Sequence, residues 1–198
     1  MNNSRDPHLQ RLLDLSASVI RAASSAPVAK AAARIFSRLE ERVGEPLAPP
    51  AERLGPCRQL AAIYARMARQ ATPLPQLANA FAALEPRLQW NRRKGAKPED
   101  RNFYNGHANA MLVGPGGLEQ RDDVWVGATV LAPDVRYIDH SHPPEEVYLA
   151  FTAGEWWNAA MDWTQPGAGG LIYNPPGILH AMRSGPQPML ALWLLPVD

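Results

Sequence analysis

The sequence has little cysteine and no long apolar run. Its single cysteine, Cys57, has no partner for a disulfide within the chain, which suits a reducing compartment and excludes the small disulfide-rich secreted folds. No segment approaches the ~18 apolar residues of a membrane span. The opening residues, MNNSRDPHLQ, lack the apolar region of a signal peptide. We therefore expect a cytoplasmic protein that does not bind membranes.

The chain has 198 residues, of which 46% are hydrophobic, and a net charge of only +1. Its length fits one domain, or one domain with an extension. A chain of this size buries about 70% of its unfolded surface, so a sizeable core is expected.

The near-zero net charge hides two different compositions. Residues 1–105 hold 17 Lys and Arg against 9 Asp and Glu, whereas residues 106–198 hold 3 against 10. The second part also carries 11 of the 14 glycines and five of the six tryptophans. A basic first part could bind nucleic acid, but it lacks helix-turn-helix spacing and its neighbour is acidic. We expect the two parts to dock and no nucleic acid to bind.

Apolar spacing in residues 1–105 is helical, whereas residues 106–198 show short apolar runs separated by Gly and Pro. We expect an α-helical N-terminal extension over 1–105 that packs on a β-barrel formed by 106–198. Gly44 is the expected stop of the second helix. The expected helices cover 9–20, 27–43, 60–67 and 75–84; the expected strands include 124–131, 146–151 and 190–195; residues 91–101, NRRKGAKPEDR, are expected to be a polar linker.

The segment DHSHPPEEVYLAF, residues 139–151, holds the densest cluster of candidate ligands. His140 and His142 lie two apart, so both point to one face of an extended chain. Glu146 and Tyr148 share a face of the following strand in the same way. Two imidazoles and a carboxylate on one face suit a first-row transition metal, and a site with few protein ligands leaves positions open for substrate.

A second segment, GGLIYNPPGILHAM at residues 169–182, adds a further histidine. Its pattern is Gly169-x5-Pro175-x-Gly177-x2-His180, in which the P-x-G turn reverses the chain and delivers His180 on the next strand. An isolated H-x-H pair is often incidental, whereas two agreeing motifs are far more specific.

Together the two segments resemble the cupin family. The resemblance implies a mainly β fold, a single cupin barrel (a double-stranded β-helix or jelly roll) preceded by the helical extension. It also implies one divalent transition metal, with Zn, Fe, Mn, Co or Ni left open. Three structural positions depart from the cupin pattern, namely Asp134, Gly154 and Ser184. The metal ligands that it implies are His140, His142, Glu146 and His180.

Within cupins, DHSHPPEEVY is similar to the dimethylsulfoniopropionate lyases, and PGILHAMRSG (176–185) followed by Trp193 resembles their Q-type members. That resemblance implies β-elimination of a small zwitterionic sulfonium carboxylate to dimethyl sulfide and acrylate. It implies Tyr148 as the base that takes the α-proton, and Tyr137 as a second tyrosine that orients substrate or assists.

The residues are consistent with this chemistry. Because Arg121, Arg136 and Arg183 are the only Lys or Arg of residues 106–198, a metal is the expected electrophile for the substrate carboxylate. A free tyrosine with a pKa near ~10 is a poor base, and a nearby dication favours its phenolate. Cations bind aromatic faces, and Tyr173 and Trp193 are the expected partners of the sulfonium.

Other functions stay open at this point. A different cupin enzyme, such as an iron dioxygenase or a sugar isomerase acting on a small carboxylate or sugar, would use the same ligands without needing Tyr148. A regulatory cupin that senses a small ligand and a structural cupin with a vestigial site are less favoured alternatives. Cupins often form homodimers. We also expect the N-terminal helices to cover or gate the mouth of the barrel.

Overall fold

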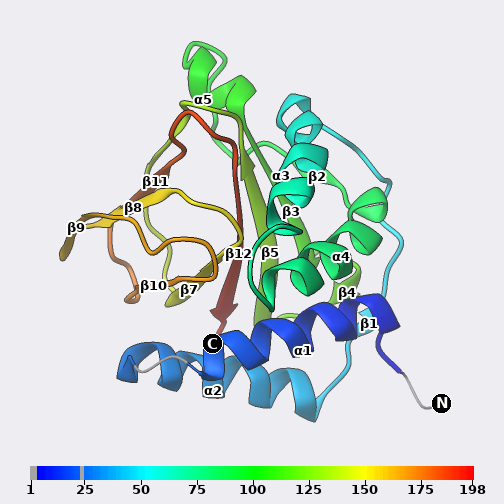
Figure 1. Cartoon of the computed structure of the whole chain (residues 1–198). Helices are drawn as coiled ribbons and strands as arrows, with labels where there is room; N and C mark the ends of the chain where they lie inside the picture. The colour runs from blue at the N-terminus through cyan, green and yellow to red at the C-terminus, as the bar shows by residue number, and fades with distance from the viewer. Residues whose placement is uncertain (1–3, 23–24) are drawn as a thin grey trace.

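The computed structural model describes residues 4–22 and 25–198, and it consists of two β-sheets with helices packed against one of them (Figure 1). The mainly β fold with N-terminal helices predicted from the sequence is confirmed. None of the described helices is long and apolar enough to cross a membrane. The helices are α1 (Pro7–Arg21), α2 (Ala26–Glu41), α3 (Leu60–Met67), α4 (Leu74–Leu84) and α5 (Arg101–Gly106), with the 3-10 helices η1 (Gly55–Gln59) and η2 (Glu85–Arg87).

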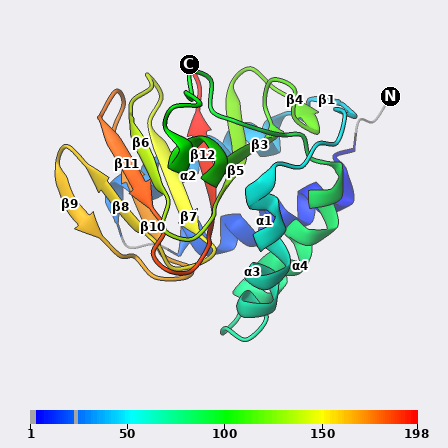
Figure 2. The ribbon, with the colours of Figure 1, turned by 90° about the horizontal axis from the view of Figure 1, so that it is seen from above.

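The two sheets face each other, and within the described residues no strand pairing joins them. The jelly roll is therefore two opposed sheets, not a closed ring; the smaller one lies at the left in Figure 2. The larger sheet has the order β1 (Glu45–Pro46), β4 (Glu119–Gln120), β3 (His107–Val113), β5 (Val124–Leu131), β12 (Met189–Pro196), β7 (Glu146–Ala150), β10 (Leu171–Asn174), with β2 (Trp90–Asn91) paired to β3. The smaller sheet has the order β6 (Arg136–His140), β11 (His180–Arg183), β8 (Glu155–Asn158), β9 (Met161–Thr164).

Side-chain alternation gives the larger sheet two different buried faces. On β7, Val147 and Leu149 belong to the core cluster shared with the helices, whereas Tyr148 and Ala150 belong to the cluster between the two sheets. Successive residues of a strand point to opposite faces, so one short strand serves both cores. All five residues of β7 are buried.

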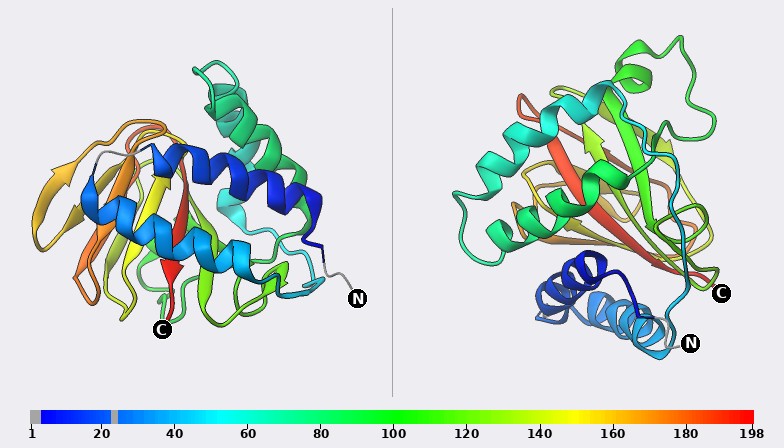
Figure 3. Two further views of the ribbon diagram at one scale, coloured as in Figure 1. Left: turned by 90° about the horizontal axis from the view of Figure 1, so that it is seen from below. Right: turned by 90° about the vertical axis from the view of Figure 1, so that its right-hand side faces the viewer.

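Helices α1 to α4 pack on the outer face of the larger sheet, whereas α5 contacts β6 and η1. Helix α2 contacts β5, β12, β7 and β10, and α1 lies beside α2 as an antiparallel partner (Figure 3). Asp6 caps α1 by accepting the backbone N–H groups of His8 and Leu9. Each of these two helices buries one apolar stripe, as its spacing predicts.

The end of α2 differs from the prediction. The helix ends at Glu41, and Arg42 is already extended, so Gly44 is not its stop. A Cβ atom on Gly44 would lie 2.0 Å from the carbonyl oxygen of Gln120. Gly44 therefore permits close approach of the chain to β4.

Two departures from the cupin pattern keep the geometry of the turn before β6. Asp134 has a φ of 57°, a left-handed conformation that glycine adopts most readily. The hydroxyl of Ser184 accepts the Val135 backbone N–H at 3.0 Å and donates to the Ala132 carbonyl at 2.6 Å. Asp134 thus adopts a glycine-like conformation, and the Ser184 hydroxyl holds the turn by its hydrogen bonds.

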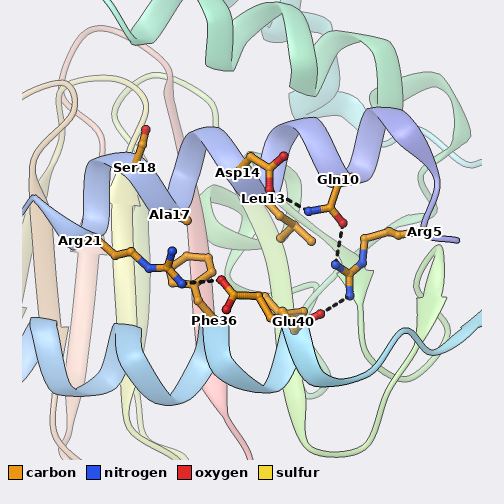
Figure 4. A pocket seen from close by; sticks show the side chains of 10 residues that line it. Arg5, Gln10, Leu13, Asp14, Ala17, Ser18, Arg21, Phe36 and Glu40 are labelled. Atoms are coloured by element: carbon orange, nitrogen blue, oxygen red, sulfur yellow. Dashed lines mark hydrogen bonds and ion pairs between the residues drawn. The ribbon is translucent and has the colours of Figure 1, made fainter.

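Basic side chains of α2 reach the acidic ends of the second part. Arg34 pairs with Glu145 at 3.0 Å, and Arg38 pairs with Asp198 at 2.5 Å. A pocket of about 270 Å³ lies between α1 and α2, and Arg21 bridges it, with its guanidinium 2.6 Å from a carboxylate oxygen of Glu40 (Figure 4). None of the described residues that line this pocket is a histidine or a cysteine.

Buried charges join Arg5, ahead of α1, to β4. The Glu119 carboxylate accepts from Arg5 Nε at 2.6 Å and from the Gly44 N–H at 2.9 Å, and lies 3.6 Å from Arg121. The side chains of Arg5, Glu119 and Arg121 are at most 5% exposed. Burial by itself would raise the pKa of Glu119, but the Arg5 guanidinium and the Gly44 amide together lower it.

We predict that Glu119→Gln lowers the free energy of unfolding by about 3–5 kcal/mol, because it leaves the buried Arg5 guanidinium without its carboxylate, whereas Arg121 keeps its ion pair with Asp123. The matched control Glu40→Gln removes the exposed carboxylate partner of Arg21. It should change the free energy of unfolding by less than about 1 kcal/mol. Urea unfolding at neutral pH measures both. Because folding depresses the pKa of Glu119, its contribution is present above the ordinary glutamate pKa and is lost as the pH falls. Equal losses in the two variants would contradict the prediction.

Candidate metal centre

A cavity of about 240 Å³ opens between the two sheets. It contains most of the residues singled out from the sequence and several that were not. Its described lining is Arg93, Asn109, Met111, Trp125, Thr129, Tyr137, His140, His142, Glu146, Tyr148, Trp193 and Leu195.

Three histidines converge beside this cavity. His140 ends β6, His142 follows it in the next loop, and His180 begins β11 and pairs with His140 in the smaller sheet. One ring nitrogen from each lies within 4.8 Å of the others. Antiparallel pairing of β6 with β11 thus brings the two sequence motifs together.

The backbone fixes how each imidazole is presented. The Nδ1 atoms of His140, His142 and His180 each lie 2.9 Å from a backbone carbonyl oxygen, those of Ile138, Pro144 and Ile178. A neutral imidazole that donates from Nδ1 has a free lone pair on Nε2. All three rings are therefore held in the form that binds a metal through Nε2.

Glu146 brings a carboxylate to the same point from β7. Its Oε2 atom lies 3.4 Å from Nε2 of His142 and 3.3 Å from Nε2 of His180, and the Asn174 amide donates to it at 3.2 Å. Burial opposes ionisation, but the adjoining imidazoles outweigh it and lower the pKa of Glu146 to about 2. Burial also lowers the pKa of His140 to about 3. Glu146 is thus ionised and His140 neutral near pH 7, as metal ligands must be.

The donor set fits a divalent transition metal. The Nε2 atom of His180 is buried and makes no hydrogen bond, although the Glu146 carboxylate oxygen lies 3.3 Å away. A buried polar atom without a partner costs about 1–3 kcal/mol, which coordination to a metal would remove. Three imidazole nitrogens and a carboxylate oxygen suit Zn, Fe, Mn, Co or Ni.

Tyr148 lies on the cavity side of β7, two residues after Glu146. It is 3% exposed and stands opposite Trp193 in the pairing of β7 with β12. Burial and then the Glu146 carboxylate hold the pKa of Tyr148 well above its ordinary value. Without a bound cation its hydroxyl therefore keeps its proton at neutral pH.

A chain of hydrogen bonds crosses the floor of the cavity. Trp193 Nε1 donates to Thr129 at 3.1 Å, the Thr129 hydroxyl donates to Asn109 at 2.6 Å, and the Asn109 amide donates to the Tyr137 hydroxyl at 2.9 Å. The Tyr137 hydroxyl is an acceptor in this chain, so its own proton can point into the cavity. Gly127 makes room for Trp193, since a Cβ there would lie 2.1 Å from the indole ring.

Tyr173 lies outside the cavity. It pairs with Val147, so it faces the helices, and its hydroxyl donates to Glu145 at 2.7 Å. Glu145 is in turn bound by Arg34. This placement does not support the sulfonium contact expected for Tyr173, whereas Trp193 does line the cavity.

The expectation that the N-terminal helices cover the barrel mouth is wrong. These helices pack on the outer face of the larger sheet, and none of their residues is among the described lining of the cavity. Arg93, from the stretch expected to be only a polar linker, lines it instead. A run of charged residues carries no sign of which one turns inward, so composition alone could not identify Arg93.

Comparisons with known proteins agree with the motifs. Residues 28–191 match the family model of dimethylsulfoniopropionate lyases. The fold is similar to the crystal structure of the dimethylsulfoniopropionate lyase DddQ from Ruegeria pomeroyi DSS-3, with a TM-score of 0.74, 25% identity, and coverage of 98% of this chain and 93% of that one. It is also similar to a chain from the crystal structures of the lyases RdDddP and RnDddQII, with a TM-score of 0.67, 21% identity, and coverage of 96% and 92%. Among curated proteins, none matches this chain. The predicted cupin fold is confirmed.

We predict that the protein binds one divalent transition metal per chain. His180→Ala should weaken this binding by at least about 10- to 100-fold, because loss of a residue that only supports a metal ligand already costs that much. The matched control His8→Ala removes an exposed histidine of α1 and should bind as the wild type does. Elemental analysis after metal loading and dialysis counts the ion. Metal-dependent stabilisation in thermal unfolding gives an independent measure. Equal binding by the two variants would contradict the assignment.

Proposed function

This chain belongs to the dimethylsulfoniopropionate lyase family, a family of carbon–sulfur lyases, and from this premise we propose that it cleaves dimethylsulfoniopropionate to dimethyl sulfide and acrylate in a metal-dependent β-elimination. The observation that carries the proposal is the cavity face of β7. There Glu146 and Tyr148 lie two residues apart, beside the three convergent histidines.

The reaction removes one proton and one leaving group. The Tyr148 oxygen takes a proton from the carbon next to the carboxylate. The electron pair of that C–H bond forms the carbon–carbon double bond, and the bond between the β-carbon and sulfur breaks with its pair on sulfur. Dimethyl sulfide leaves as a neutral molecule, acrylate remains, and the proton on Tyr148 returns to solvent.

His140, His142, Glu146 and His180 would hold the metal. When bound, a divalent ion supplies a Lewis acid for the substrate carboxylate and favours the phenolate form of a neighbouring tyrosine. The buried position of Tyr148 keeps competing water away from the abstracted proton. We assign Tyr137 the part of a hydrogen-bond donor that orients the substrate, because Asn109 already donates to its oxygen.

The sulfonium group would lie against indole rings. Trp193 and Trp125 both line the cavity, and aromatic faces attract cations by roughly 0.5–2 kcal/mol each. Trp125 takes the place that the sequence suggested for Tyr173. Both indoles come from the larger sheet, where Leu195 of β12 pairs with Trp125 of β5.

We predict that purified, metal-loaded protein releases dimethyl sulfide from dimethylsulfoniopropionate, as measured in the headspace, and that a chelator abolishes the release. Tyr148→Phe should reduce the rate by about 10²- to 10⁴-fold, the usual contribution of a general base, while it keeps its metal. Tyr64→Phe is the matched control, because the Tyr64 hydroxyl is buried without a hydrogen-bond partner in α3 and does not line the cavity.

Two results would overturn the proposal. If metal-loaded wild-type protein releases no dimethyl sulfide, the lyase activity is refuted and a different cupin reaction on a small carboxylate takes its place. If Tyr148→Phe retains the wild-type rate, Tyr148 is not the base.

A further inference from the structure

Arg93 is the one cationic side chain among the described residues that line the cavity, setting aside the imidazoles. It is not paired with the cavity's carboxylate, because Glu146 lies against His142 and His180. Arg93 is also only partly exposed. Its side chain hydrogen-bonds Tyr137 and pairs with no carboxylate of the described residues. A guanidinium without a carboxylate partner at the wall of a cavity is a binding group for an anion.

A hydrogen bond to His107 holds the backbone of Arg93 against β3. The Arg93 N–H donates to His107 Nε2 at 2.8 Å, and His107 Nδ1 contacts the Phe103 carbonyl oxygen. The His107 ring is fully buried and stacks on the Phe103 ring with centroids 3.8 Å apart. Burial lowers the pKa of His107 to about 4, so the ring stays neutral and Nε2 stays an acceptor. The charged loop is thus held at a defined place on β3.

Strand register separates the backbone of Arg93 from Trp125 along the cavity. Asn109 of β3 pairs with Thr129 of β5. Two residues farther along β3, Met111 pairs with Gly127, and Trp125 lies two residues beyond Gly127 on β5. Arg93 is bound at the level of His107, on the other side of Asn109 from the tryptophans.

The same register places Tyr148 beside Trp193. Trp193 pairs with Gly127 on one side and with Tyr148 on the other. At the level of the backbone, Tyr148 therefore lies between His107, which binds the Arg93 N–H, and Trp125.

We propose, resting on the lyase function above, that Arg93 binds the carboxylate of the zwitterionic substrate and sets its direction in the cavity. The planar guanidinium offers N–H donors to the carboxylate, whose remaining lone pairs stay available to the metal. The sulfonium then lies at the tryptophan end, and the carbon next to the carboxylate lies beside Tyr148. A sulfonium or ammonium ion without a carboxylate lacks this anchor, so Arg93 is the residue that selects the substrate class.

The test uses propionate, a carboxylate without a sulfonium, and the metal-loaded protein. Titration followed by tryptophan fluorescence or calorimetry should show that Arg93→Gln weakens propionate binding by about 10- to 100-fold, as expected for loss of a charged hydrogen bond. Binding of trimethylsulfonium should change less than about twofold. Arg92→Gln is the matched control, because the Arg92 side chain bonds the Tyr104 carbonyl and stacks on its ring outside the cavity.

The outcomes separate this inference from the lyase function. Propionate binding that depends on Arg93 would support the carboxylate site even if no dimethyl sulfide were released. Equal binding of propionate by Arg93→Gln and Arg92→Gln, with equal metal content, would overturn it. In an active enzyme, Arg93→Gln should also raise the KM for dimethylsulfoniopropionate, and Arg93→Lys should restore part of the loss.

His107 acts as a positioning residue in this arrangement, and a double-mutant cycle tests it. His107→Leu should weaken propionate binding when Arg93 is present and have no further effect in Arg93→Gln. The same loss in both backgrounds would show that His107 contributes only to the fold.

Discussion

The two-residue alternation of side chains along β7 is the constraint on which both the core and the site depend. Val147 and Leu149 face the helices, while Glu146 and Tyr148 face the cavity. A slip of one residue in register would place a carboxylate and a tyrosine in the apolar core under α2 and two aliphatic side chains beside the histidines. The free energy that buries Val147 and Leu149 is therefore the same free energy that holds the candidate ligand and base in place.

The backbone also determines the chemistry of the histidines. Each Nδ1 atom lies 2.9 Å from a carbonyl within two residues of its own ring, so local chain geometry presents every Nε2 atom to the centre. Only Glu146 among the candidate ligands depends on a side chain from another strand, through Asn174 on β10. The Asn158 amide N–H in turn donates to the Asn174 side-chain carbonyl oxygen at 3.1 Å. This bond links the candidate ligand Glu146 to the smaller sheet.

The sequence was sufficient where a function depends on local spacing and insufficient where it depends on register. Two motifs led to the cupin fold and to candidate ligands that the structure brings together. Tyr173 was misplaced because its face is set by pairing with Val147, which no local pattern reveals. The hydrogen-bonded residues Asn109 and Thr129 lie on two different strands, so no local sequence motif could identify them together. Gly44 was assigned to a helix end, although its lack of a Cβ serves contact with β4, which lies far along the chain.

The basic first part of the chain has two structural roles, and Arg93 accounts for the second. Arginines of α2 neutralise the acidic ends of the second part, as Arg34 does with Glu145 and Arg38 with Asp198. Those contacts explain a basic extension on structural grounds alone. Residues 106–198 contribute no arginine or lysine to the described lining of the cavity, however, and its one guanidinium comes from the first part. A boundary near residue 105 therefore follows the change in composition but cuts through the cavity. In the reaction proposed above, the acidic, aromatic second part attracts the sulfonium and the first part receives the carboxylate.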